Sequence, residues 1–207
     1  MLLARRIWNW CRRFRHRCGY GVHSPSDFFL ITSVMYEGLP YYAYDRLKMA
    51  SSNLSLPHYR EKVNKLLFRL VNYFRPMTLL EVGKGNGDAF RYLCASRSSM
   101  MSVGLEESTK EDTLRQLDVE LKRMKRLDFV HIAFTPYYIE VFERVFPYLH
   151  DESCVVIGNI YESKKREAWW KELTNDERVR FSFDLYDIGL LLFEKKRFKQ
   201  HYIVNFF

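Results

Sequence analysis

The sequence predicts an α/β fold in which helices alternate with the strands of a mostly parallel sheet. At residues 78–94 a short apolar run is followed by three glycines at alternate positions and then by a helical pattern. Further apolar runs and amphipathic helical patterns alternate toward the C-terminus. At 207 residues with 47% hydrophobic content, the chain is long enough to form one domain with a full core.

Residues 1–56 are expected to form a helical N-terminal extension, and residues 57–207 the α/β domain. Residues 1–20 contain six arginines and no acid, which accounts for six of the eight net positive charges. One helical face carries four apolar side chains, Leu3, Ile7, Trp10 and Phe14. We expect this stripe to pack on the domain with the arginines in solvent. Attachment of residues 1–18 to an anionic membrane surface stays open, whereas nucleic acid is not an expected partner.

Two further helices are predicted ahead of the glycine turn. Ser24 as N-cap, with Pro25 at the first helical position and Asp27 at the third, predicts a helix start. Residues 57–74 carry apolar side chains on one side and end before Pro76, which predicts the second of these helices.

The glycine turn has the pattern of a ligand site at the end of a strand. Glu81 is followed by Gly83, Gly85 and Gly87, whereas a dinucleotide fingerprint has the spacing G-x-G-x-x-G. Glycines permit a sharp turn and the close approach of a ligand, and the free N–H groups of the next helix face it. Glu106 ends the second predicted strand, where an acid either accepts hydrogen bonds from a ribose diol or simply begins the next helix. A turn that binds nothing is the alternative.

The acid-x-G-x-G-x-G turn resembles the S-adenosylmethionine (SAM) turn of class I methyltransferases. Four motifs extend the resemblance over nearly the whole chain: Gly-Val-His-Ser-Pro at 21–25, Tyr-Tyr-Ala-Tyr at 41–44, the glycine turn at 79–87 and Leu-Asp-Phe-Val-His-Ile at 127–132. Together they are similar to a group of bacterial methyltransferase-like proteins that is common in Bacteroidetes and related to the catechol-type O-methyltransferases. This similarity implies a Rossmann-like fold with SAM as the cofactor.

The resemblance also implies which residues contact the cofactor. Gly83, Gly85 and Gly87 would border its methionine part, and Glu81 would help to hold its amino group. Glu106, from its place at the end of the second predicted strand, is the candidate for the ribose.

The chain departs from the family in one part of the sheet. The family has a helix, a third strand and another helix between the second strand, which is expected at residues 100–105, and the strand expected at 128–134. Residues 109–127 have room for only one helix, because a strand–helix–strand unit takes about 30 residues. We therefore expect the third strand to be missing or greatly reduced. Helices are then predicted at 136–149 and 163–174, and strands at 154–157, 178–186, 190–193 and 202–206.

A second departure concerns the acids that place a divalent cation in the family. The family usually ends its fourth strand in Asp-Gly and its fifth in Asp-Asp, whereas this chain has Ala133-Phe134 and Gly158-Asn159 there. A hard cation needs several oxygen ligands, so no metal is expected. His131 is the one nearby candidate base, and the alternative is that it is buried in its strand, so no catalytic residue is assigned.

Two functions stay open. The first is a SAM-dependent methyltransferase that needs no metal and acts on a small-molecule acceptor. The second is a catalytically inactive protein that keeps the fold as a binding or oligomerisation scaffold, for example as a homo-oligomer. Four scattered cysteines without a C-x-x-C pair, and no signal peptide, predict a cytoplasmic protein. A membrane-peripheral position through residues 1–18 stays open.

Overall fold

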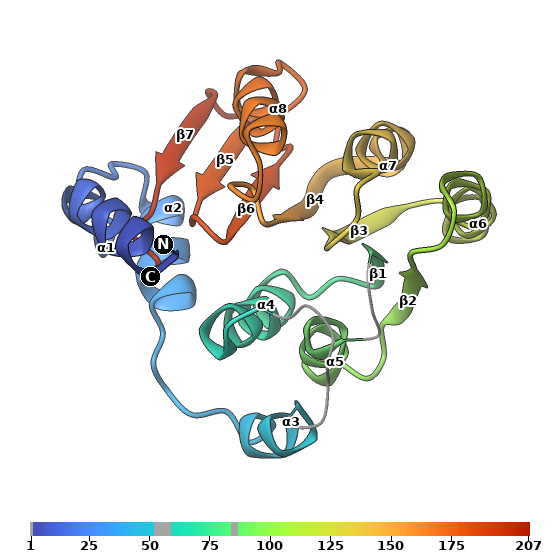
Figure 1. The fold of residues 1–207 in the computed structure, drawn as a ribbon, viewed down its shortest axis with the longest axis horizontal. Helices are drawn as coiled ribbons and strands as arrows, with labels where there is room; N and C mark the ends of the chain where they lie inside the picture. The colour runs from blue at the N-terminus through green and yellow to red at the C-terminus, as the bar shows by residue number, and fades with distance from the viewer. Residues whose placement is uncertain (1, 52–58, 84–86) are drawn as a thin grey trace.

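The computed structural model describes residues 2–51, 59–83 and 87–207, which form a seven-stranded sheet with helices on both faces (Figure 1). The strand order is β2-β1-β3-β4-β6-β5-β7. β6 runs antiparallel to its neighbours β4 and β5, and the other pairs are parallel. The strands are β1 Thr78–Gly83, β2 Met101–Glu106, β3 Leu127–Ile132, β4 Leu149–Gly158, β5 Phe181–Asp184, β6 Ile188–Leu192 and β7 Gln200–Ile203.

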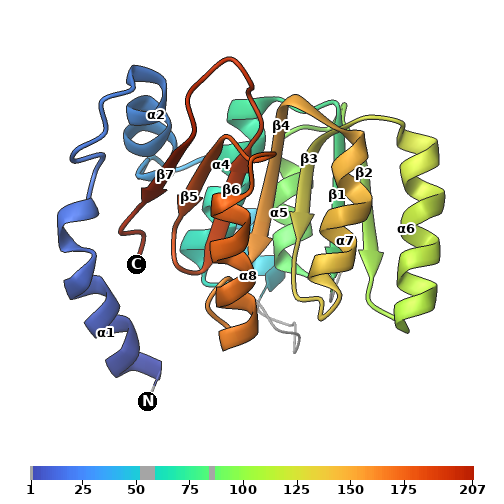
Figure 2. The same ribbon diagram turned by 90° about the horizontal axis from the view of Figure 1, so that it is seen from above.

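Helices α4 and α5 cover one face of the sheet, and α6, α7 and α8 cover the other (Figure 2). Helices α1 and α2 lie beyond the β7 edge (Figure 2). The helices are α1 Leu2–Arg12, α2 Pro25–Phe29, α3 Tyr44–Ser51, α4 Glu61–Phe74, α5 Asp88–Ala95, α6 Lys110–Met124, α7 Tyr138–Val145 and α8 Lys164–Asn175. Short 3-10 helices span Phe14–His16 and Phe146–Tyr148, and a π-helix, Leu30–Met35, continues α2.

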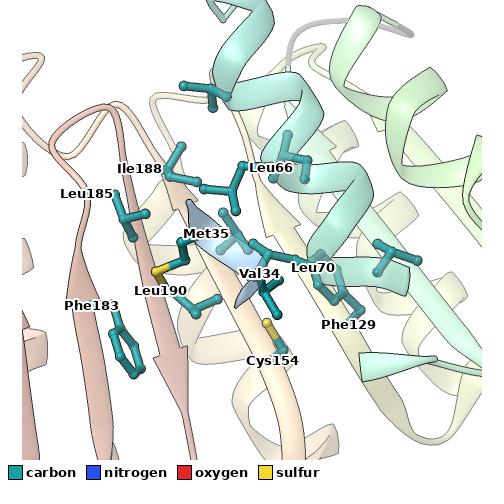
Figure 3. Close-up of a cluster of buried hydrophobic side chains, with 14 of the residues drawn as sticks. Val34, Met35, Leu66, Leu70, Phe129, Cys154, Phe183, Leu185, Ile188 and Leu190 are labelled. Carbon is teal, nitrogen blue, oxygen red and sulfur yellow. The ribbon is translucent and has the colours of Figure 1, made fainter. Parts of the chain in front are cut away.

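The core on the α4 face joins the N-terminal extension to the sheet. Val34 and Met35 of the π-helix lie beside Leu66 and Leu70 of α4, over strands β3 to β6 (Figure 3). Buried Arg69 of α4 donates hydrogen bonds to the carbonyl oxygens of Val34 and Met35, at 2.7 and 2.9 Å. These bonds satisfy carbonyl groups that the end of the helix leaves without partners.

The predicted fold class is confirmed, including the shortened part of the sheet. Residues 107–126 are all described, and they contain one helix and no strand, so β2 forms an edge of the sheet. Ser24 caps α2 as predicted, with its Oγ accepting a hydrogen bond from the amide of Asp27. The helix predicted from residue 57 begins at Glu61. The predicted boundary between residues 56 and 57 lies outside the described residues.

The prediction for the N-terminal helix is wrong in its orientation. Its apolar stripe does not pack on the domain, because Ile7, Trp10 and Phe14 are 56%, 39% and 52% exposed. Arginines face the domain instead: Arg6 pairs with Asp187 at 2.7 Å, and buried Arg13 pairs with Asp184 at 2.7 Å. The physical reason is that the end of β5 and the turn after it offer two carboxylates, which the helix periodicity of residues 1–14 does not reveal.

Candidate functional site at the carboxyl edge of the sheet

The parallel strands end at one edge of the sheet, and the chain changes direction there between β1 and β3. From β1 it crosses to β2 on one side, and it returns to β3 on the other. Open α/β sheets bind ligands at such a switch point, outside the carboxyl ends of the strands. Gly83 and Glu106 are paired in register at the ends of β1 and β2, so the exposed Glu106 lies beside Gly83.

Gly83 and Gly87, the two glycines of the motif that the structure describes, have different surroundings. Gly83 has φ +148°, and a Cβ there would lie 2.8 Å from the backbone nitrogen of Phe134. A side chain is therefore excluded by the protein's own β3–α7 connection. Gly87 is the N-cap of α5, and Gly85 lies outside the described residues.

Asp88 begins α5 directly after the turn, and the sequence analysis did not single it out. Its carboxylate is buried, and Oδ1 has no hydrogen-bond partner among the described residues. The first amide groups of the helix and its positive end lie at the same place. An unsatisfied buried acceptor beside free N–H groups suits a ligand that carries both a cationic and an anionic group.

Glu81 and His131 form a buried pair beneath the turn. The two residues are in register on β1 and β3, so their side chains lie on the same face of the sheet. Oε2 of Glu81 lies 2.7 Å from Nδ1 of His131, whose Nε2 lies 3.1 Å from the hydroxyl of Tyr59. Burial and, next, the charge of Glu81 raise the pKa of Tyr59, so the hydroxyl keeps its proton. In the tautomer with its proton on Nδ1, His131 donates to Glu81, and its Nε2 accepts from the Tyr59 hydroxyl.

Tyr59 fills the space at the end of β4. A Cβ at position 158 would lie 1.9 Å from the Tyr59 hydroxyl, so Gly158 leaves room for the phenol. The ring also packs on Phe134 at a centroid distance of 4.7 Å. Sequence reasoning missed Tyr59, because a residue just before α4 carries no signal that it reaches the ends of β3 and β4.

A buried guanidinium lies at the end of β3. Arg166 of α8 donates to the carbonyl oxygen of Ala133 at 3.0 Å and to Glu162 at 2.8 Å, and it stacks over the ring of Tyr138. A fixed positive charge thus lies next to one of the positions where the resembled family has an acid. Within the described part of the chain, no group of three or more His, Cys, Asp or Glu side chains could hold a metal ion.

The polar groups at this edge fit SAM in part. Glu106 can accept hydrogen bonds from a ribose diol, and the α5 terminus with Asp88 can take the carboxylate and ammonium groups of an amino acid. Oε2 of Glu81, in contrast, is already paired with His131.

Comparisons with known proteins give the fold. No protein-family model and no curated protein sequence matches the chain. A methyltransferase from Geobacter sulfurreducens matches with a TM-score of 0.55 at 14% identity, over 77% of this chain and 92% of that one. An O-methyltransferase from Bacillus cereus in complex with SAH matches with a TM-score of 0.53 at 16% identity, over 77% of this chain and 95% of that one. The O-methyltransferase TomG from Streptomyces achromogenes in complex with SAM matches with a TM-score of 0.52 at 15% identity, over 75% of this chain and 91% of that one. The chain therefore has the fold of the class I SAM-dependent O-methyltransferases.

Proposed function

We propose that the protein binds SAM at the carboxyl edge of β1 and β2 and is a metal-independent methyltransferase for a small-molecule acceptor. The observation that carries this proposal is the placement of Glu106 beside Gly83, with α5 beginning directly after the turn. This arrangement gathers an exposed carboxylate, a chain turn and helix N–H groups at the switch point of the sheet.

Each part of the cofactor then has a partner in the chain. Glu106 holds the ribose diol, and Gly83, Gly85 and Gly87 border the methionine part. Asp88 accepts from the amino group, and Glu81, oriented by His131, adds negative charge near it. SAM supplies a methyl group already activated on a sulfonium, so the protein has only to align an acceptor and remove its proton.

Metal independence is supported by what lies at the ends of β3 and β4. Ala133 and Gly158 offer no side-chain oxygen, and the guanidinium of Arg166 is bonded to the Ala133 carbonyl. The Tyr59 hydroxyl occupies the space that a side chain at position 158 would need. Oxygen ligands on which a hard cation depends are thus replaced by a cation and a phenol of the chain itself.

A scaffold without catalysis is the second candidate, and two observations favour it. The sheet lacks the strand that would flank β2, so that Glu106 lies on an edge strand. Glu81 and Tyr59 are committed to a buried contact with His131. A protein that kept the fold for binding or oligomerisation would retain such packing and lose the cofactor.

Calorimetric titration with SAM and with SAH separates the two candidates. We expect micromolar binding that the Glu106→Gln variant weakens by about 10- to 100-fold, since a hydrogen bond to a charged group contributes about 1.5–3 kcal/mol. Glu111→Gln, on the exposed first turn of α6, is the matched control and should bind as the unmodified protein does. Absence of heat near millimolar ligand, from protein that is folded by circular dichroism, would support the scaffold instead.

A further inference from the structure

The outer face of α1 is apolar and has no partner among the described residues. Arg6, Asn9 and Arg13 point to the domain, where they contact Asp187, Tyr186 and Asp184. The opposite side of α1 therefore faces solvent. It carries Ile7, Cys11 and Trp8, the last 65% exposed, with Trp10 and Phe14 at one flank.

The charged side chains of α1 and of the residues that follow it are all positive, since the first acid in the sequence is Asp27. On the side toward α8, Trp8 and Arg12 line a shallow hollow together with Glu167 and Lys171. Arg6 and Arg13 are neutralised by aspartates of the fold, whereas Arg12 and Arg15 are exposed. Arg17 lies over the rings of Trp10 and Phe14, at 5.9 and 5.5 Å from their centroids. Aromatic and basic side chains are thus interleaved on one surface.

We propose that this outer face of α1 binds the surface of a membrane that contains anionic phospholipid. Tryptophan and isoleucine side chains would lie at the boundary between headgroups and acyl chains, with the arginines on the phosphates. None of the helices within the described ranges is long and apolar enough to cross a membrane, so α1 would lie in the plane of the surface. Charge decides between occupants: a second copy of α1 would bring arginines against arginines, whereas anionic headgroups are complementary.

The ion pairs of Arg6 and Arg13 with the domain fix the orientation of α1. A free amphipathic helix of 11 residues is marginal in water, whereas ion pairs to Asp184 and Asp187 fix this helix on the domain with its apolar side outward. The surface is therefore formed before the membrane is met, and binding does not depend on whether SAM occupies the other site.

Tryptophan fluorescence reports directly on the proposed contact. The chain has four tryptophans, of which Trp169 and Trp170 are buried and Trp8 and Trp10 are exposed on α1. Titration of the full chain with vesicles of phosphatidylcholine and phosphatidylglycerol should shift the emission to shorter wavelength. Pure phosphatidylcholine vesicles should bind much more weakly. Brominated lipid should quench the shifted emission.

Variants identify the residues responsible. Arg12→Gln combined with Arg15→Gln should weaken partitioning by about 25-fold, since each arginine near an anionic surface contributes about fivefold. Trp8→Ala should weaken it as well. Phe198→Ala is the control, because this side chain is 90% exposed but belongs to the β6–β7 connection.

Several results would overturn the proposal. Equal binding to neutral and anionic vesicles, or no effect of the double arginine variant, would remove its electrostatic basis. Loss of dimerisation in Trp8→Ala, measured by light scattering without lipid, would assign the face to a second copy. Binding of an RNA oligonucleotide that requires Trp8, with no vesicle binding, would assign it to nucleic acid.

Discussion

Replacement of Arg13 by methionine tests whether ion pairs, rather than apolar contacts, hold the N-terminal helix on the domain. The guanidinium donates to both carboxylate oxygens of Asp184, at 2.7 and 3.0 Å, and to the hydroxyl of Tyr161 at 2.9 Å. Both charged groups are buried. Arg13→Met keeps much of the side-chain volume and leaves the Asp184 carboxylate inside the protein without its cation.

The expected loss follows from that uncompensated charge. Removal of one partner from a buried ion pair costs about 3–5 kcal/mol. Asp184 retains two donors, the Tyr161 hydroxyl and the amide of Tyr186, so we expect the lower end, about 3 kcal/mol of unfolding free energy. In urea this corresponds to a decrease in the unfolding midpoint of about 1 M or more.

The matched control is Arg12→Met, one residue away on the same helix but exposed, which should change the unfolding free energy by less than about 0.5 kcal/mol. Hydrogen exchange of the α1 amides should accelerate in Arg13→Met and not in the control. The double variant Arg13→Met with Asp184→Asn should lose less unfolding free energy than the sum of the losses in the two single variants. If Arg13→Met were as stable as Arg12→Met, the ion-pair account of helix docking would be refuted.

Two further predictions concern the far half of the sheet. Gly189→Ala should lower the unfolding free energy by about 1–3 kcal/mol, because a Cβ there would lie 2.3 Å from the ring of Trp170. His201 is exposed overall, but its Nδ1 lies 2.8 Å from the Ser182 hydroxyl, and partial desolvation of the ring lowers its pKa. The folded state therefore binds fewer protons than the unfolded chain. Stability is complete above about pH 6.5, the ordinary histidine pKa, and decreases slightly as the pH falls below it. Urea unfolding between pH 5 and 7.5 should show this slope, and His201→Gln should reduce it.

The control for Gly189→Ala comes from an exposed position. Gly38→Ala adds a methyl group with no neighbouring atom within 4 Å and should leave stability nearly unchanged. Equal losses in Gly38→Ala and Gly189→Ala would contradict the packing argument.

Much of the fold was predictable because its signals are local. The glycine turn, the apolar runs of β1 to β4 and the Ser24 cap all lie within a few residues of the elements that they specify. The missing strand was predictable from the resemblance together with the length of the segment, because residues 109–127 are too few for the three elements that the family has there. The buried Glu81–His131 pair could in principle have been predicted, since an acid and a base occupy matching positions of adjacent parallel strands.

Other features depend on contacts between distant segments, which periodicity does not encode. The orientation of α1 is set by Asp184 and Asp187, more than 170 positions along the chain from their arginine partners. Helix periodicity identified the apolar side correctly but could not say whether that side faces the core. Tyr59 is a similar case, because its position over Gly158 follows from the path of the chain into α4.

The glycines at this edge show why a sequence motif cannot by itself establish a cofactor site. Gly83 and Gly158 both lack the room for a Cβ, yet the obstructing atoms belong to Phe134 and Tyr59 of the same chain. A glycine indicates that some atom lies too close for a side chain, and at these two positions the close atoms belong to the protein itself rather than to a ligand. The decisive residue is therefore Glu106, whose side chain is exposed at the end of β2, in register with Gly83. A loss of SAM affinity in Glu106→Gln at unchanged stability would assign that carboxylate to the cofactor, whereas a loss of stability alone would assign it to the fold.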